Sequence, residues 1–289
     1  MQFRRVLPVL FVGAPALLLA GCTFENAPIL DAAGPISQWE RDILFRAFGI
    51  MMIVIIPVFV MTAVFAWRYR ATSTKSRYDP DWDSAKVDAV TWIIPAIIVL
   101  AIAIHVWIFT HALDPYKPIE SDNEPLEVQV VAQDWKWLFI YPDQDVASVN
   151  QLAFPSDTPL TLKITSDTVM NSFFIPALGS QIYAMAGMQT QLNLLSDEPG
   201  TFVGRNMQYS GDGFADQHFE AVAMTQADFD AWIAEVKGAA ESLSDEAYDA
   251  LAKPSIDHPV THYSSVADGL YERIVLKYDC GMTCAAPAQ

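Results

Sequence analysis

Two long apolar stretches without Asp, Glu, Lys or Arg constrain this chain more than any other feature. They span residues 47–67 and 89–113. As a helix rising about 1.5 Å per residue, the first would extend over about 31 Å, which matches the hydrocarbon core of a bilayer. Pro57 and Pro95 lie inside the stretches, where neighbouring helices commonly satisfy the carbonyls that a proline frees. We therefore expect a transmembrane hairpin over residues 43–113.

Basic residues set the expected orientation of this hairpin. The connection between the two stretches, residues 68–88, is rich in them, whereas only Lys117 follows the second stretch closely. Because basic residues are retained in the cytoplasm, we expect the connection to lie inside and the chain after residue 113 to lie outside. The basic residues of the connection are Arg68, Arg70, Lys75, Arg77 and Lys86.

The N-terminus is typical of a bacterial export signal. Arg4 and Arg5 precede an apolar run over residues 6–20, which is too short to span a membrane. Leu-Leu-Ala-Gly-Cys, ending at Cys22, matches the lipoprotein processing pattern, so we expect residues 1–21 to be removed and Cys22 to be lipidated. A plain signal peptide with an incidental cysteine is the alternative. After removal of residues 1–21, residues 22–42 would form a periplasmic N-terminus, which agrees with the expected orientation of the hairpin.

The chain after residue 113 predicts a β-sandwich with a helical tail. Alternating apolar residues and turn signals favour a sandwich over residues 114–225, whereas apolar spacings of three and four predict two or three short helices in residues 226–289. The expected fold class is thus a membrane-anchored all-β protein with a short helical C-terminal extension. The strand candidates are residues 127–137, 149–154, 160–165, 189–195 and 217–224.

Acidic residues dominate the part of the chain expected outside the membrane. From residue 114 onward there are eight Lys and Arg against twenty-six Asp and Glu. Docking of a basic protein such as a cytochrome would use such a surface. The acids are dispersed along the chain, however, so we favour a solvated surface that is kept soluble by its charge.

Two segments give the chain a family resemblance. They are Asp134-Trp135-Lys136-Trp137, expected in the first strand, and residues 169–188, which read VMNSFFIPALGSQIYAMAGM. With the hairpin and the acidic sandwich, they resemble subunit II of the haem-copper terminal oxidases, which implies a cupredoxin-like sandwich. In the branch that takes electrons from cytochrome c, this domain binds a dinuclear copper centre. Its ligands are a His in a Val-x-His-Ser-aromatic segment and the motif Cys-x3-Cys-x3-His-x2-Met.

Every copper-ligand position of that family pattern is substituted in this chain. Neither amide, hydroxyl nor phenyl groups supply the bridging thiolates of a dinuclear copper centre, so we expect no metal in this chain. The retained scaffold is similar to the cytochrome bo-type ubiquinol oxidase branch, which implies a subunit without its own redox cofactor. The substituted positions are Asn171, Asn206, Ser210, Phe214 and Gln217.

The resemblance also implies partners and a location. It places the haems, the second copper and the quinol in subunit I of a complex in the bacterial inner membrane, with subunits III and IV and membrane lipid as further partners. Neither cytochrome c nor nucleic acid is expected to bind. Two alternatives stay open, namely a menaquinol oxidase subunit and a free-standing membrane lipoprotein whose sandwich binds a ligand or a partner.

Asp88 is the one candidate for chemistry in this chain. It opens the second apolar helix at the expected cytoplasmic face, where the family commonly has a Glu at the mouth of a proton-uptake pathway into subunit I. An acid in the first turn of a helix is also stabilised by the helix dipole, by about 0.3–1 kcal/mol, without any further role. Both interpretations remain open at the level of sequence.

The remaining candidates are expected to make contacts and not to react. Trp135 and Trp137 match an aromatic cluster that implies packing at the interface with subunit I. His105 and His111 lie near the outer end of the second apolar stretch, where headgroups or a partner subunit are within reach. His218 is expected to be an ordinary satisfied or solvent-facing histidine.

Cys280 and Cys284 reproduce the Cys-x3-Cys spacing of the copper motif, but they lie near the C-terminus with no His or Met after them. A local disulfide or two idle thiols is the expected state of this pair outside the cytoplasm.

Overall fold

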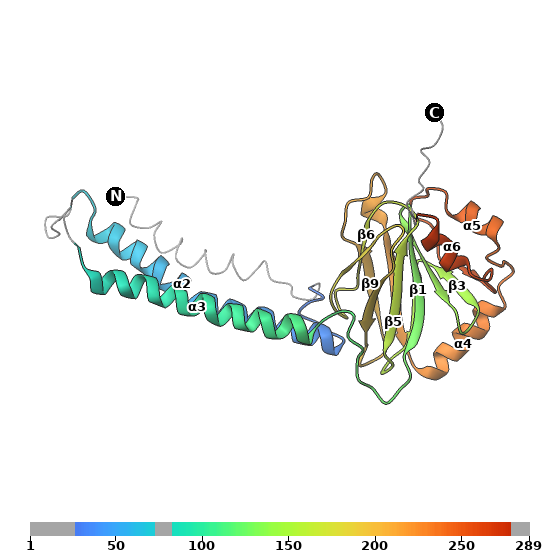
Figure 1. Ribbon diagram of the computed structural model, residues 1–289, viewed down its shortest axis with the longest axis horizontal. Helices are drawn as coiled ribbons and strands as arrows, with labels where there is room; N and C mark the ends of the chain where they lie inside the picture. The colour runs from blue at the N-terminus through green and yellow to red at the C-terminus, as the bar shows by residue number, and fades with distance from the viewer. Residues whose placement is uncertain (1–26, 73–82, 279–289) are drawn as a thin grey trace, which may run out of the picture.

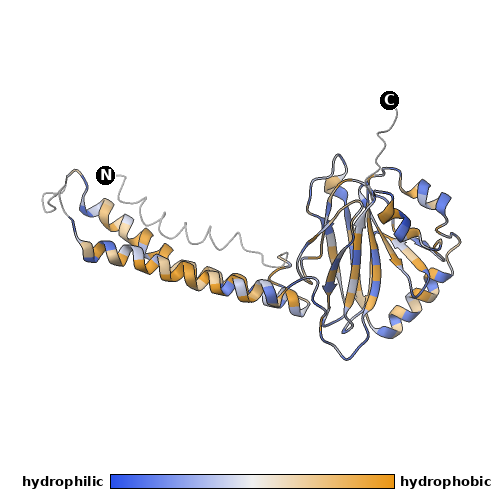
Figure 2. Cartoon of the chain, viewed as in Figure 1, coloured by the Kyte–Doolittle hydropathy of each residue, from blue (hydrophilic) through white to orange (hydrophobic). Residues whose placement is uncertain are grey.

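A computed structural model describes residues 27–72 and 83–278, with two long antiparallel helices beside a two-layered β-domain (Figure 1). The helices are α2 (Pro35–Arg68) and α3 (Ala85–Ala112). Their surfaces are apolar along most of their length (Figure 2), and large side chains such as Phe59 and Trp92 are 73% and 79% exposed. Such surfaces require hydrocarbon or a protein partner around them, and both helices are long and apolar enough to cross a membrane, as the expected hairpin requires. Cys22, Lys75, Arg77, Cys280 and Cys284 lie outside the described residues.

The β-domain consists of two sheets packed face to face. The six-stranded sheet has the order β11-β3-β2-β1-β5-β8, and the five-stranded sheet has the order β4-β10-β9-β6-β7. The strands are β1 (Leu126–Gln133), β2 (Lys136–Tyr141), β3 (Val146–Val149), β4 (Gln151–Pro155), β5 (Leu160–Ser166), β6 (Asn171–Phe174), β7 (Ile182–Ala184), β8 (Thr190–Leu194), β9 (Gly200–Asn206), β10 (His218–Met224) and β11 (Thr261–Tyr263).

The six-stranded sheet buries side chains on both of its faces. Alternate residues of β2, such as Trp137 and Phe139, enter the core between the two sheets. The residues between them, Leu138 and Ile140, enter a second core under the helices α5 (Asp245–Leu251) and α6 (Leu270–Leu276). The helix α4 (Gln226–Lys237) packs on the first core instead, through Phe229 and Val236. All three helices lie on the side of the domain away from the hairpin (Figure 1). The predicted sandwich with a short helical extension is confirmed.

One predicted strand is wrong in its extent. Residues 127–137 do not form a single strand, because β1 ends at Gln133 and the chain reverses through Asp134 and Trp135 into β2. Trp135 has φ +65°, a left-handed conformation that suits a tight two-residue hairpin turn. The Asp-Trp-Lys-Trp segment is therefore a turn at one end of the sandwich, and not the middle of a strand.

The start of α2 and the end of α3 are both fixed to the sandwich. At the start of α2, Ser37 Oγ donates a hydrogen bond to Ala177 O at 2.7 Å, and the Ala33 and Gly34 backbone lies against the loop before β9. After α3, Asn193 Nδ2 in β8 donates to Pro115 O at 3.0 Å. These contacts position the β-domain relative to the membrane hairpin.

Candidate functional site

Four of the five positions that the resemblance aligns with copper ligands meet at the end of the sandwich that carries the β1–β2 turn. Asn171 begins β6, Asn206 ends β9, Ser210 lies in the loop that follows, and Gln217 directly precedes β10. The side chains of Asn171, Asn206 and Gln217 are buried, and Ser210 is half-buried. The strand order brings these positions together, since β6, β9 and β10 are neighbours in one sheet. We call these four residues the amide cluster.

The amide cluster satisfies its own polar groups. Asn206 Nδ2 donates to Asn171 Oδ1 at 2.7 Å and to Gln217 Oε1 at 2.8 Å, and it also approaches Ser210 Oγ at 3.1 Å. Ser210 Oγ donates to Gln217 Oε1 at 2.9 Å. Asn206 Oδ1 accepts the Ser172 backbone N–H at 2.8 Å. Hydrogen bonding of this density is what buried amides need, because an unpartnered polar group in a core is costly.

Phe214 does not join the amide cluster. It begins the short helix η2 (Phe214–Asp216), is half-buried, and packs against Tyr209 with 5.6 Å between the ring centroids. The fifth position of the expected set is thus an aromatic contact at the edge of the loop.

The chemistry of these side chains does not fit a dinuclear copper centre. Such a centre needs soft thiolate and imidazole donors, whereas the positions offer neutral amide and hydroxyl groups that are already hydrogen-bonded to one another. Within residues 27–72 and 83–278, no group of three or more His, Cys, Asp or Glu side chains is placed to hold a metal ion. His218 is exposed at the start of β10, beside this region, and pairs in the sheet with Arg205 of β9.

The two tryptophans of the β1–β2 turn have different roles. Trp135 Nε1 donates to Ser210 O at 3.1 Å, and its ring covers Gly213 so closely that an added Cβ there would lie 2.4 Å from the ring. Trp137 is fully buried between the sheets, with its ring centroid 5.3 Å from that of Phe173. The expectation that Trp137 packs at a subunit interface is therefore wrong, because its ring is enclosed by the sandwich. Trp135 is half-buried and fixes the loop that carries Ser210.

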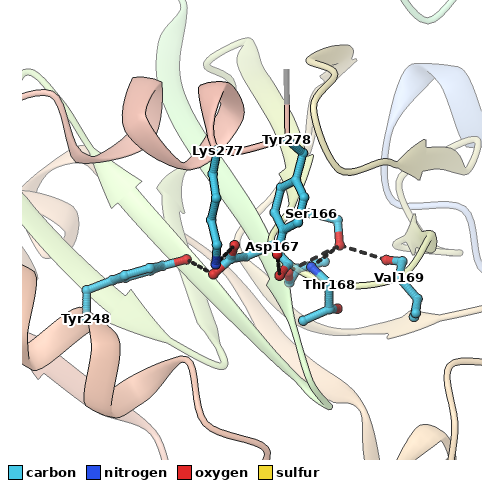
Figure 3. A network of polar contacts seen from close by, with 8 residues as sticks. Ser166, Asp167, Thr168, Val169, Tyr248, Lys277 and Tyr278 are labelled. Atoms are coloured by element: carbon cyan, nitrogen blue, oxygen red, sulfur yellow. Dashed lines mark hydrogen bonds and ion pairs between the residues drawn. The ribbon is translucent and has the colours of Figure 1, made fainter. Parts of the chain in front are cut away.

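A second polar group, centred on Asp167, ties the C-terminal helices to the same end of the sandwich (Figure 3). The buried Asp167 carboxylate accepts the Tyr248 hydroxyl from α5 at 2.7 Å and pairs with Lys277 Nζ, just after α6, at 2.7 Å. The Tyr278 hydroxyl donates to Asp167 O at 2.7 Å. Asp167 lies four residues before Asn171, so the tail holds the loop that leads into the amide cluster.

The Asp167 group shifts the titration of its members. Burial and the adjacent Asp167 charge raise the pKa of the Tyr248 hydroxyl. Burial works against the charged form of Lys277, but the hydrogen bond and the charge of Asp167 outweigh it and raise the pKa of this ammonium. Sequence reasoning missed this group, because Asp167, Tyr248 and Lys277 are far apart in the chain and no motif links them.

Lys136 makes a further contact between the turn and the tail. Its side chain is buried, and Nζ donates to Lys253 O and Ser255 Oγ, each at 2.8 Å. Burial lowers the pKa of this ammonium, while the nearby Asp134 opposes the shift. Both ends of the Asp-Trp-Lys-Trp turn are thus engaged, by the loop of Ser210 on one side and by the tail on the other.

The candidate residues of the second apolar stretch lie towards the two ends of α3, Asp88 at its start and the two histidines near its end. Asp88 lies exposed in the first turn, after the N-cap residue Ser84. His111 Nδ1 lies 2.8 Å from Trp107 O, and the His105 ring is tilted against that of Phe109, with 4.6 Å between centroids.

Comparison with known proteins gives consistent matches along the chain. Residues 97–218 match the family model described as "Cytochrome C oxidase subunit II, periplasmic domain", and residues 237–281 match "COX Aromatic Rich Motif". The chain is 48% identical to "Cytochrome bo(3) ubiquinol oxidase subunit 2" of Pseudomonas putida, over 99% of this chain and 90% of the relative. It is 47% identical to "Ubiquinol oxidase subunit 2" of Acetobacter aceti, over 92% of this chain and 87% of that relative.

Proposed function

Because this chain belongs to the ubiquinol oxidase subunit II family, we propose that it acts in that complex as a membrane-anchored subunit without a redox centre of its own. The single observation that carries this proposal is the amide cluster. Its side chains offer no thiolate or imidazole, and they are hydrogen-bonded to one another and to the neighbouring backbone. In this proposal the haems and copper lie in subunit I, which oxidises quinol and reduces oxygen to water, and subunits III and IV complete the complex.

The electron donor follows from the same side chains. A subunit that cannot form the dinuclear copper centre has no entry point for electrons from cytochrome c, so quinol delivers them directly to subunit I. The role of this chain is then mechanical: the hairpin and the sandwich buttress subunit I from the membrane and from the outer surface. The inner membrane and a lipid on Cys22 are the location and the modification that we propose.

Purification in mild detergent tests the assignment. We expect the full chain to co-purify with a haem-bearing partner, and the preparation to consume oxygen with ubiquinol but not with reduced cytochrome c. A chain that emerges without any haem-bearing partner would support the free-standing lipoprotein, and a strong preference for menaquinol over ubiquinol would support the other alternative. Copper added to the full chain under reducing conditions should give no thiolate-to-copper charge-transfer colour; a stoichiometric purple species would overturn the proposal.

We propose Asp88 as an entry point for protons into subunit I. Its carboxylate is exposed at the start of α3, at the end of the hairpin expected to face the cytoplasm. Asp88→Asn should slow turnover and proton uptake while the complex still assembles, because an amide cannot carry the proton. Asp83→Asn is the matched control, since Asp83 is also exposed but precedes the helix. Equal turnover in the two variants would remove the role.

A further inference from the structure

A hollow lies where the membrane hairpin joins the sandwich. It has a volume of about 280 Å³ and is formed by the first turns of α2 on one side and by the chain leaving α3 on the other. Its lining combines apolar surface from Ile36, Trp39 and Ile119 with charged groups on Asp114, Lys117 and Glu120. Neither the amide cluster nor Asp88 touches it, and the proposed function does not use it.

The walls of this hollow are preformed. Asn193 Nδ2 donates to Pro115 O at 3.0 Å and to Lys117 O at 3.2 Å, which fixes the chain after α3 onto β8. Thr161 Oγ1 donates to Asn193 Oδ1 at 2.9 Å and orients that amide. The opposite wall is fixed by the hydrogen bond from Ser37 to Ala177 O. Ordering of the site on ligand binding would therefore cost little free energy, and preorganisation of this kind favours binding.

The hollow lies at the depth of lipid headgroups. The apolar stretch of α3 ends at residue 113, and Leu113 is itself part of the lining. Trp39 is 49% exposed and packs on Phe109 of α3, with 5.9 Å between ring centroids. Exposed tryptophans at the ends of membrane helices mark the interface between hydrocarbon and water.

The charges select one class of headgroup. Among the described residues, no ion pair involves the Lys117 ammonium or the Glu120 carboxylate. One cation beside two carboxylates complements a phosphate joined to a primary ammonium, whereas an anionic headgroup would face two uncompensated acids. A quaternary ammonium would have no N–H group to donate to the carboxylates.

We propose that this hollow binds the headgroup of an ethanolamine phospholipid in the outer leaflet. The phosphate contacts Lys117, the ammonium faces Asp114 and Glu120, and the acyl chains descend along the apolar surface of α2 and α3 from Ile36 and Trp39. The lipid would contact both α2 and the chain after α3, and would hold the β-domain at a fixed distance from the membrane surface. The inference rests on the membrane placement of the chain and not on the identity of its electron donor.

Native mass spectrometry of the delipidated oxidase complex tests the site. The complex is titrated separately with phosphatidylethanolamine, phosphatidylglycerol and phosphatidylcholine. We expect one tight phosphatidylethanolamine per complex that Lys117→Gln weakens about tenfold, the loss of a charge-assisted phosphate contact. Glu120→Gln should reduce the preference for phosphatidylethanolamine over phosphatidylcholine. Lys237→Gln, which removes an exposed charge at the end of α4, is the control and should change neither result.

Three results would overturn the site. They are equal binding of the three lipids by the unaltered complex, equal affinities in Lys117→Gln and Lys237→Gln, and an unchanged lipid preference in Glu120→Gln. Co-purification of the haem-bearing partner is recorded in the same spectra. If the unaltered complex keeps its haem-bearing partner but does not bind phosphatidylethanolamine, only this inference is contradicted. If the haem-bearing partner is absent, the proposed function is contradicted.

Discussion

At the scale of single residues, Asn206 is the centre of the amide cluster. Its side chain contacts Asn171, Gln217 and the Ser172 backbone. Asn206→Ala leaves these groups buried without partners, so we expect the free energy of unfolding to fall by about 2–4 kcal/mol. Chemical unfolding of the full chain in detergent measures the loss. Arg205→Ala, at the exposed neighbouring position, should stay within about 0.5 kcal/mol of the unaltered chain; equal losses would mean that the cluster contributes nothing specific.

At the join between α2 and the sandwich, the backbone around Gly34 leaves no room for a side chain. A Cβ at this position would lie 2.0 Å from Leu195 O, a distance that only a backbone shift relieves. Gly34→Ala should therefore lower the thermal midpoint of the full chain and its yield in the complex. Gly49→Ala is the matched control inside α2, since a Cβ there meets nothing within 4 Å. If both variants behave alike, the close contact at Gly34 is not what holds the helix.

Alkaline pH should destabilise the β-domain through the Asp167 group. The pKa values of Tyr248 and Lys277 are raised in the folded chain, so both bind their protons more tightly when folded. Their contribution is complete below the unfolded values of about 10 and is lost as the pH rises through the folded ones. Tyr248→Phe should therefore show a shallower loss of stability above about pH 10 in unfolding titrations. Tyr183→Phe, at an exposed strand position, should keep the steep loss; identical slopes would contradict the assignment.

At the scale of elements, the tail acts through its last two described residues. Lys277 pairs with the Asp167 side chain and Tyr278 binds its backbone carbonyl, so together they hold the loop from β5 to β6. A chain ending at Leu276 should show faster hydrogen exchange in residues 166–171, whereas one ending at Tyr278 should match the full chain. Exchange that is equally fast in both truncations would shift the role to residues after 278.

The limits of sequence reasoning also appear at this scale. The hairpin could be predicted because an uncharged stretch of this length has few other solutions. The positions of the amide cluster came from the family resemblance, but the hydrogen bonds among them and the separation of Phe214 did not. β2 was missed because α5 and α6 cover the second face of its sheet. Leu138 and Ile140 are therefore as buried as Trp137 and Phe139, and no alternation marks the strand. The turn at Trp135 was missed because its left-handed backbone is unusual for a tryptophan.

At the scale of the whole molecule, the hairpin and the sandwich are joined at two separate points. α2 is fixed through Ser37 and Ala177, and the chain after α3 is fixed through Asn193. Two attachments restrict rotation about either one, so the sandwich is held in a defined orientation over the membrane. A subunit that serves as a buttress needs such an orientation, because a domain on a flexible linker would sample many positions relative to its partner.

Removing one attachment should release the linker without unfolding the sandwich. Asn193→Ala removes the side-chain hydrogen bonds to Pro115 and Lys117 and leaves one contact, from the residue 193 backbone N–H to Pro115 O at 3.2 Å. We therefore expect faster hydrogen exchange in residues 113–120 and slower quinol turnover in the complex. Asn123→Ala is the matched control, because Asn123 ties the same linker to Asp157 O at 2.7 Å, further from the membrane. Faster exchange at residues 113–120 in Asn193→Ala with unchanged turnover would mean that orientation is not limiting. If exchange there is also unchanged, the Asn193 side chain does not hold the linker in the working complex.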